Sequence, residues 1–142
     1  MSTVDEVREA SKNFYVALNR MANGESNTLA VAWEQNGSVT AMHPIGGREV
    51  GWDAVEGSFN QVASVASDGK VELKNQLINV LGDVAYEVGI EALQFKMAGQ
   101  EIGGEIRVTN IYRKEGGIWK VVHHHTDTSP AMIEVLQKLQ PK

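Results

Sequence analysis

Hydrophobic positions in the first half of the chain recur at helical spacing. Apolar residues at intervals of three or four along 4–21 predict a helix of about five turns that ends near Asn23-Gly24. Ser26 can cap a short second helix. A third helix is expected over 52–66, and Ser129-Pro130 is a typical start for a tail helix. The core positions expected on these helices are Val7, Phe14, Leu18, Met21, Leu29, Ala32, Trp33, Val55, Phe59, Val62, Met132, Val135, Leu136 and Leu139.

The second half of the chain changes to a two-residue period. Strands are predicted over 70–80, 84–97, 101–113 and 118–127. Short turns separate them, which indicates an antiparallel meander because parallel strands need long crossovers. An earlier short strand over 38–42 is followed by a loop at 43–47, where proline and paired glycines interrupt any regular pattern. Helices first and a sheet later describe one α+β domain over 1–142.

Composition narrows the class of protein. The chain has 142 residues, 42% apolar and 22% charged, and a formal net charge of −5 with scattered basic residues, which argues against a nucleic-acid surface. No apolar stretch approaches the roughly 20 residues of a membrane span. The N-terminus lacks the pattern of a secretory signal and the chain has no cysteine, so a cytoplasmic location is expected.

The run 118–127 carries three of the four histidines. In a regular strand, His123, His125 and Asp127 share one face with Trp119 and Val121, and His124 lies on the other. This face either lines a pocket or is a solvated sheet surface, and both interpretations stay open. In one of two registers for the last hairpin, the pocket face also receives Arg107 opposite His125 and Thr109 opposite His123.

A metal site is the natural rival hypothesis for two histidines on one face. Alternate residues of a strand lie roughly 6.5 to 7 Å apart and can share an ion. The third ligand would come from His43, Glu87 or Asp127, and nothing in the spacing selects one. We therefore predict no metal and no cofactor. No serine lies in a Gly-x-Ser-x-Gly context, and Gly46-Gly47 lacks the spacing of a phosphate-binding loop.

A family resemblance is carried by five segments of the chain: 43–47, 49–52, 85–91, 107–113 and 117–125. Together they resemble the nuclear transport factor 2-like superfamily, in its SnoaL-like and ketosteroid-isomerase-like branch, and also the association domain of calcium/calmodulin-dependent kinases. The resemblance implies a cone-shaped, curved mixed or antiparallel sheet wrapped around N-terminal helices. It also implies a small-molecule ligand in the cone and a homodimer through the outer sheet face. Function varies widely within such a fold.

The resemblance also allows a comparison with ketosteroid isomerases. Their proton-abstracting aspartate precedes Pro-x-Gly, and His43 falls there. Their helical tyrosine falls on Phe14, with Tyr15 one place away, and their buried acid falls near Thr109. Steroid isomerisation is therefore not expected, although His43 can act as a base because imidazole titrates near neutral pH.

The sequence thus predicts a pocket for a small, partly polar, anionic ligand held by Arg107. Glu87 is a candidate partner for Arg107 inside the cone, and Glu91 is expected in solvent. His43 and His123 are the candidate bases. The candidate ligand-binding residues are Tyr15, Trp33, Trp52, Glu87, Arg107, Thr109, His123, His125 and Asp127. As an alternative to ligand binding, Trp33 and Trp52 can belong to the hydrophobic core. A proton-transfer enzyme and a non-catalytic sensing or assembly module both remain open.

Overall fold

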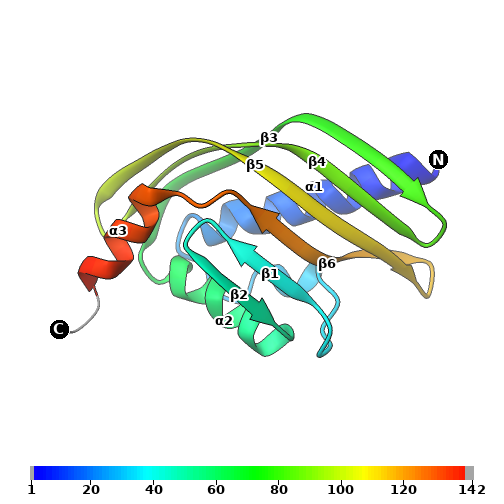
Figure 1. Ribbon diagram of the computed structural model, residues 1–142, viewed down its shortest axis with the longest axis horizontal. Helices are drawn as coiled ribbons and strands as arrows, with labels where there is room; N and C mark the ends of the chain where they lie inside the picture. The colour runs from blue at the N-terminus through cyan, green and yellow to red at the C-terminus, as the bar shows by residue number, and fades with distance from the viewer. Residues whose placement is uncertain (1, 140–142) are drawn as a thin grey trace.

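The computed structural model describes residues 2–139 (Figure 1). The helices are α1 (Thr3–Met21), α2 (Trp52–Ala63) and α3 (Pro130–Leu139), with a 3₁₀ turn, η1 (Leu29–Val31). The strands are β1 (Thr40–His43), β2 (Gly46–Val50), β3 (Ala66–Leu81), β4 (Val84–Met97), β5 (Gln100–Glu115) and β6 (Ile118–Thr126). None of the helices within 2–139 is long and apolar enough to cross a membrane.

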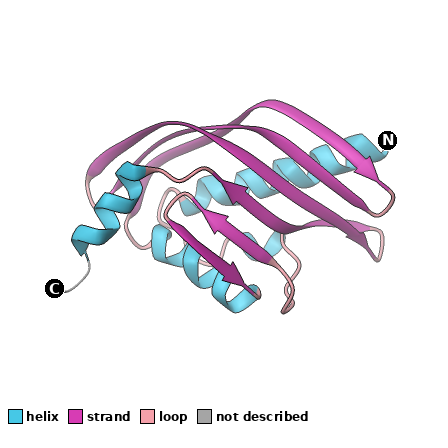
Figure 2. Ribbon diagram, viewed as in Figure 1, coloured by secondary structure: helices cyan, strands magenta, loops and turns pink. Residues whose placement is uncertain are grey.

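The strands of the described chain form one six-stranded sheet in the order β2-β1-β6-β5-β4-β3. β1 runs parallel to β6, and the other neighbouring strands are antiparallel. The long strands β3, β4 and β5 arch over α1, while α2 lies beside β1 and β2, and α3 lies at the end away from the N-terminus (Figures 1 and 2). This arrangement confirms the α+β class and the curved, open sheet of the cone fold.

The curvature has a local cause in β3. The pairing of β3 with β4 shifts register between Ser67 and Lys70 and again between Lys74 and Leu77. Such bulges bend a strand and increase its twist. In β4, Gly89 lies where a Cβ atom would come within 2.9 Å of the Lys74 carbonyl oxygen. The absence of a side chain therefore lets the two strands stay paired through the bend.

The predicted first helix is confirmed in position and orientation. Ser2 accepts a hydrogen bond from the backbone N–H of Asp5, and the Asp5 side chain accepts one back from Ser2, which closes a capping box. Val7 and Phe14 are fully buried against the sheet. The helix ends at Met21, close to the stop predicted from Asn23-Gly24.

Three local predictions differ from the structure. The segment after His43 turns through Pro44 and Ile45 and returns as the strand β2, since Gly46 adopts a φ of 89° that lets the turn close. The helix predicted to 66 ends at Ala63. The second helix is only the turn η1, which has no side-chain cap.

A bulge in β6 changes which side chains face the core. Tyr112 pairs with Val121, but Ile111 pairs with His123, so Val122 is an extra residue. Past this point the alternation is inverted: His124 is 2% exposed, while His125 is exposed. The predicted inward face of His123, His125 and Asp127 was therefore wrong, because regular alternation assumes that no residue is inserted.

Candidate functional site

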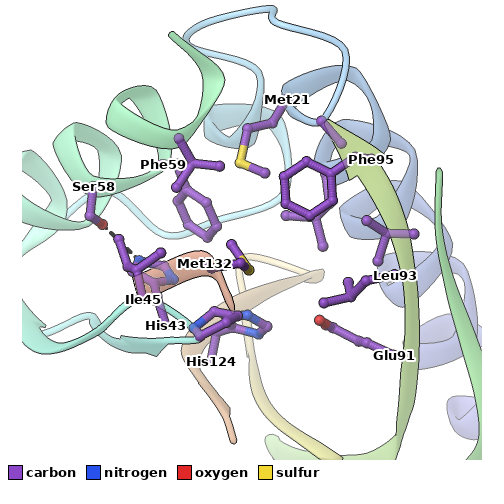
Figure 3. Close-up of a pocket in the computed structure, with 15 residues that line it drawn as sticks. Met21, His43, Ile45, Ser58, Phe59, Glu91, Leu93, Phe95, His124 and Met132 are labelled. Carbon is purple, nitrogen blue, oxygen red and sulfur yellow. Dashed lines mark hydrogen bonds between the residues drawn. The ribbon is translucent and has the colours of Figure 1, made fainter. Parts of the chain in front are cut away.

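A cavity lies on the inner face of the sheet, between the end of α1, α2, β4 and α3 (Figure 3). Its enclosed volume is about 50 Å³, and the empty space reaches about 490 Å³ only when the mouth that opens to solvent is counted. The walls are mostly apolar, and polar groups gather on one side, from His43, Ser58, Glu91 and His124. The apolar walls are formed by Leu18, Met21, Ala22, Pro44, Ile45, Phe59, Val62, Val71, Leu93, Phe95 and Met132.

His43 reaches the cavity from the last position of β1, where the alternating pattern turns it inward. Its Nε2 lies 2.7 Å from Ser58 Oγ, and that hydroxyl donates its own proton to the Val55 carbonyl at 2.7 Å. Ser58 must therefore accept from His43, so the proton of the neutral ring lies on Nε2 and Nδ1 carries the lone pair. Burial lowers the pKa of His43 to about 4.

His124 lies beside His43, with ring centroids 5.9 Å apart. The bulge in β6 turns it inward, and its Nδ1 lies 2.6 Å from Asn110 Oδ1. Its Nε2 forms no hydrogen bond with any residue of 2–139. Burial, followed by the nearby histidines, holds the pKa of His124 well below its ordinary value, so both rings are neutral at neutral pH.

Glu91 faces the two histidines from β4, and Figure 3 shows its carboxyl group pointing toward His124. The Tyr15 hydroxyl donates to Glu91 Oε2 at 2.8 Å. Burial raises the pKa of Glu91 to about 7, against the opposing effect of the Tyr15 hydrogen bond. Burial and the nearby Glu91 raise the pKa of Tyr15 well above its ordinary range, so the phenol stays a donor. The expectation that Glu91 is solvated was wrong, since it is 2% exposed.

Behind this site lies a second buried carboxyl group, Glu87, which is fully buried. Glu87 Oε1 accepts from Tyr112 Oη at 2.7 Å and from Asn110 Nδ2 at 2.9 Å, and Oε2 accepts from Gln76 Nε2 at 2.6 Å. The predicted ion pair of Glu87 with Arg107 inside the cone was wrong. Three neutral donors satisfy the carboxyl group instead.

Arg107 and Asp127 lie on the outer face of the sheet and bind each other. Arg107 donates from Nε and Nη2 to the two carboxylate oxygens, both at 2.9 Å, and 80% of its side chain is exposed. These hydrogen bonds hold the pKa of Asp127 down at about 2. Neither residue lines the inner cavity, so the sequence-based placement of the fixed charge in the cone was wrong.

His123, His125 and Thr109 also lie on the outer side. His123 Nδ1 is 2.6 Å from Thr40 Oγ1, and the rings of His123 and His125 are 6.0 Å apart. Thr109 pairs with His125 in the β5–β6 ladder rather than with His123. Within residues 2–139 no cluster of three histidine, cysteine or carboxylate side chains is placed to hold a metal ion.

The two tryptophans belong to the core rather than to the cavity wall. Trp33 is fully buried and packs edge-on against Phe14 and Phe59, with ring centroids 6.2 and 5.8 Å away. Trp52 is half-buried beside Trp33, at 6.1 Å. Tyr15 is buried as well and meets the site through its hydrogen bonds with Glu91 and Asn110.

Sequence reasoning therefore found His43 but missed His124, Glu91, Asn110 and Ser58 as members of the site. For Glu91 the sequence does offer a signal. Side chains alternate between the two faces of β4, and Glu91 therefore shares a face with the apolar Phe95. For His124 no comparable signal exists, since its facing depends on the bulge.

Comparison with known proteins settles the family. The SnoaL-like domain family matches residues 7–132. The chain belongs to this family. No curated protein sequence matches it.

Solved structures match this SnoaL-like chain along most of its length. A proposed dehydratase of the nuclear transport factor 2-like family from Streptomyces avermitilis is 24% identical, covers 89% of this chain and 95% of its own, and has a TM-score of 0.77. A nuclear transport factor 2-like superfamily protein from Salmonella enterica is 17% identical, with coverages of 87% and 89% and a TM-score of 0.77. The CaMKII hub of S. rosetta is 20% identical, with coverages of 91% and 98% and a TM-score of 0.73. At these identities the likeness shows the shared fold.

Proposed function

We propose that this SnoaL-like protein binds a small, uncharged, mostly apolar organic molecule in the inner cavity and transfers protons on it. The observation that carries the proposal is the convergence of His43, His124 and Glu91 on one side of an otherwise apolar cavity. Pockets of this kind, with apolar walls and a few placed polar groups, are typical of small-molecule sites.

The charges around the cavity favour a neutral ligand. The titratable groups that line it are His43, His124 and Glu91, and both imidazoles are neutral at neutral pH. An anion would enter a poorly solvated space beside a carboxyl group with no cation to compensate it. The anionic ligand predicted from Arg107 thus loses its support, because that guanidinium lies on the outer face.

The three groups have complementary capacities for general acid–base chemistry. Glu91, with a pKa of about 7, can give or take a proton near neutral pH, and Tyr15 engages only one of its oxygens. His43 Nδ1 and His124 Nε2 are unprotonated at neutral pH and can accept a proton, although burial lowers the pKa of both rings and makes them weaker bases than a free imidazole. Of the two bases predicted from sequence, His43 stays in the proposal and His124 takes the place of the outward-facing His123.

The reaction class that fits is elimination of water from a β-hydroxy carbonyl compound, or tautomerisation of a carbonyl compound. In the elimination, a histidine takes the proton from the carbon next to the carbonyl group. The C–H electron pair forms the C=C bond, and the C–O bond breaks as Glu91 protonates the departing hydroxyl. The similarity to a proposed dehydratase supports this class.

The test begins with a thermal-shift screen of neutral ketones, enones and β-hydroxy ketones. Exchange of the proton next to the carbonyl group for solvent deuterium is then followed by NMR. Glu91→Gln and His124→Gln are expected to slow exchange by about 10² to 10⁴-fold, the usual contribution of a positioned acid or base.

The matched control is His123→Gln, one position away on the same strand, with an expected change within about twofold. Exchange at the wild-type rate in both inner variants would refute the proposal. Loss of exchange in the His123 variant would do the same, since it would move the chemistry to the outer face.

A second candidate function is self-association through the outer sheet face. A hollow on that face brings the apolar side chains of Leu77, Val88 and Ile90 next to Arg107 and Asp127, and Leu77 is 60% exposed. The similarity to a kinase hub supports this candidate, which can coexist with a ligand site.

Analytical ultracentrifugation tests the second candidate. Leu77→Asp is expected to convert a wild-type dimer to monomer while the inner cavity keeps its ligand, because the substitution lies on the opposite face. A wild-type protein that is monomeric at about 100 μM would remove this candidate, since a dimer interface of standard size binds more tightly than that.

A further inference from the structure

We propose that Asn110 is a positioning residue that sets where the protons of the site lie. It holds His124 as the Nδ1–H tautomer and directs the hydroxyl proton of Tyr15 to Glu91. The chemical consequence rests on the proposed function, because it explains why His124 Nε2 is free to act as a base.

The orientation of the Asn110 amide is fixed from behind the site by Glu87. Asn110 Nδ2 lies 2.9 Å from Glu87 Oε1, and both side chains are fully buried. That oxygen also accepts from Tyr112 Oη. If the amide were rotated by half a turn, its carbonyl oxygen would face a carboxylate oxygen, and two acceptors cannot form a hydrogen bond.

The fixed amide then determines the tautomer of His124. Asn110 Oδ1 lies 2.6 Å from His124 Nδ1, and a carbonyl oxygen can only accept. The Nδ1 atom must therefore carry the proton. Because the ring is neutral, Nε2 is left with its lone pair.

The remaining amide hydrogen acts on Tyr15. Asn110 Nδ2 lies 3.0 Å from Tyr15 Oη, so the amide donates and the phenol oxygen accepts. The single phenol proton is then free for Glu91 Oε2, at 2.8 Å. One side chain thus orders the hydrogen bonds of both a candidate base and a candidate acid.

A direct test reads the tautomer from ¹⁵N chemical shifts of the histidine rings at neutral pH, without any ligand. In the wild type, His124 is expected as Nδ1–H and His43 as Nε2–H, so the two inner rings give opposite patterns in one spectrum. A His124 ring with its proton on Nε2 would overturn the inference with the wild-type protein alone.

Substitutions separate positioning from a merely structural role. Asn110→Leu removes the acceptor and should lower the ratio of Nδ1–H to Nε2–H at His124 by about tenfold or more, the factor that corresponds to a lost buried hydrogen bond. Asn110→Asp should restore the wild-type ratio, since two adjacent buried carboxyl groups share a proton and still present an oxygen to His124. Unchanged tautomers in the leucine variant, or no rescue by aspartate, would contradict the inference.

The control is Tyr112→Phe, which removes a different donor from Glu87 and leaves the amide contact with His124 intact. Its tautomer ratio should stay within about twofold of wild type. The ¹⁵N spectra can match the predicted tautomers while no variant affects proton exchange on any carbonyl compound. In that case the proposed function fails and the role of Asn110 stands.

Discussion

His124 on the inner face of β6 is buried, hydrogen-bonded to a buried amide and neutral, whereas its neighbour His125 is exposed on the outer face beside His123. The two carboxyl groups differ in the same way. Burial raises the pKa of Glu91 to about 7 inside, and hydrogen bonds from Arg107 lower the pKa of Asp127 to about 2 outside.

The difference teaches that residue type alone does not determine chemistry on this sheet. On the outer face, charged partners and water stabilise ionised forms. On the inner face, burial favours neutral forms, and neutral groups that can exchange a proton are the ones suited to acid–base catalysis. One inserted residue, Val122, decides which histidine belongs to which region.

The largest expected effect is on stability, at the buried carboxyl group behind the site. Glu87→Ala leaves the donors of Asn110 and Tyr112 without an acceptor and opens a cavity, which should cost about 3–5 kcal/mol in the free energy of unfolding. Urea denaturation measures this difference.

The contrast with the outer face comes from Asp127→Ala, which breaks the exposed pair with Arg107. Its unfolding midpoint should stay close to that of the wild type, because exposed ion pairs contribute little. Equal destabilisation by both substitutions would break the comparison between the faces.

The next effect is the pH dependence of stability that arises from Glu91. Its pKa is about 7 in the folded state against 4.5 for the ordinary side chain, so between these values the folded protein holds a proton that the unfolded chain has released. The contribution of Glu91 to the free energy of unfolding is therefore fully present below pH 4.5. It falls by about 3 kcal/mol as the pH rises through 7.

Glu91→Gln should remove that loss, so the free energy of unfolding of the variant minus that of the wild type should rise between pH 4.5 and 7. His43 and His124 are common to both proteins and cancel in the difference. Asp127→Asn provides the control, since the pKa of Asp127 lies at about 2, outside this window. A flat difference for Glu91→Gln would mean that Glu91 is solvated after all.

A smaller effect is expected in histidine reactivity. Carbethoxylation followed by mass spectrometry should modify His125 readily. His43 and His124, which are 5% and 2% exposed, should react at least about tenfold more slowly, because the reagent must wait for local opening. Fast reaction at His124 and protection at His125 would show that the bulge in β6 is absent.

The smallest effect is expected for Arg107→Ala. The pKa of Asp127 should rise from about 2 toward its ordinary value of 3.8, as seen by ¹³C NMR, because the hydrogen bonds from the guanidinium are lost. Binding of a neutral ligand to the inner cavity should change by less than about twofold, since the two sites share no contacts. A large loss of affinity would instead support the anchoring role that the sequence suggested.

The fold was largely predictable because its signals are local and repeated. The helical stripe around Phe14, the two-residue period of the long strands and the short turns between them each indicate one element. The strand β2 escaped prediction because Gly46 and Gly47 read as a loop, whereas their positive φ values serve a tight return into a second strand.

The site was only partly predictable because it depends on which face of the sheet each side chain occupies along the long strands. His43 was found, since it is next to a proline turn and the family resemblance points there. A bulge inserts a single residue and reverses the facing of the residues that follow it. The bulge in β6 therefore places His124, rather than His123 and His125, in the cavity wall. The burial of Glu91 beside Tyr15 depends on contacts between residues 76 positions apart, which no local pattern encodes.

The central claim is that the inner face holds an acid–base site whose carboxyl group titrates near neutral pH. The most direct measurement is a ¹³C NMR titration of the Glu91 side-chain carboxyl carbon in the wild-type protein, assigned by its loss in Glu91→Gln. The account predicts a midpoint near 7. A midpoint near the ordinary value of 4.5 would contradict it, because Glu91 would then be a plain solvated carboxylate with no proton to give at neutral pH.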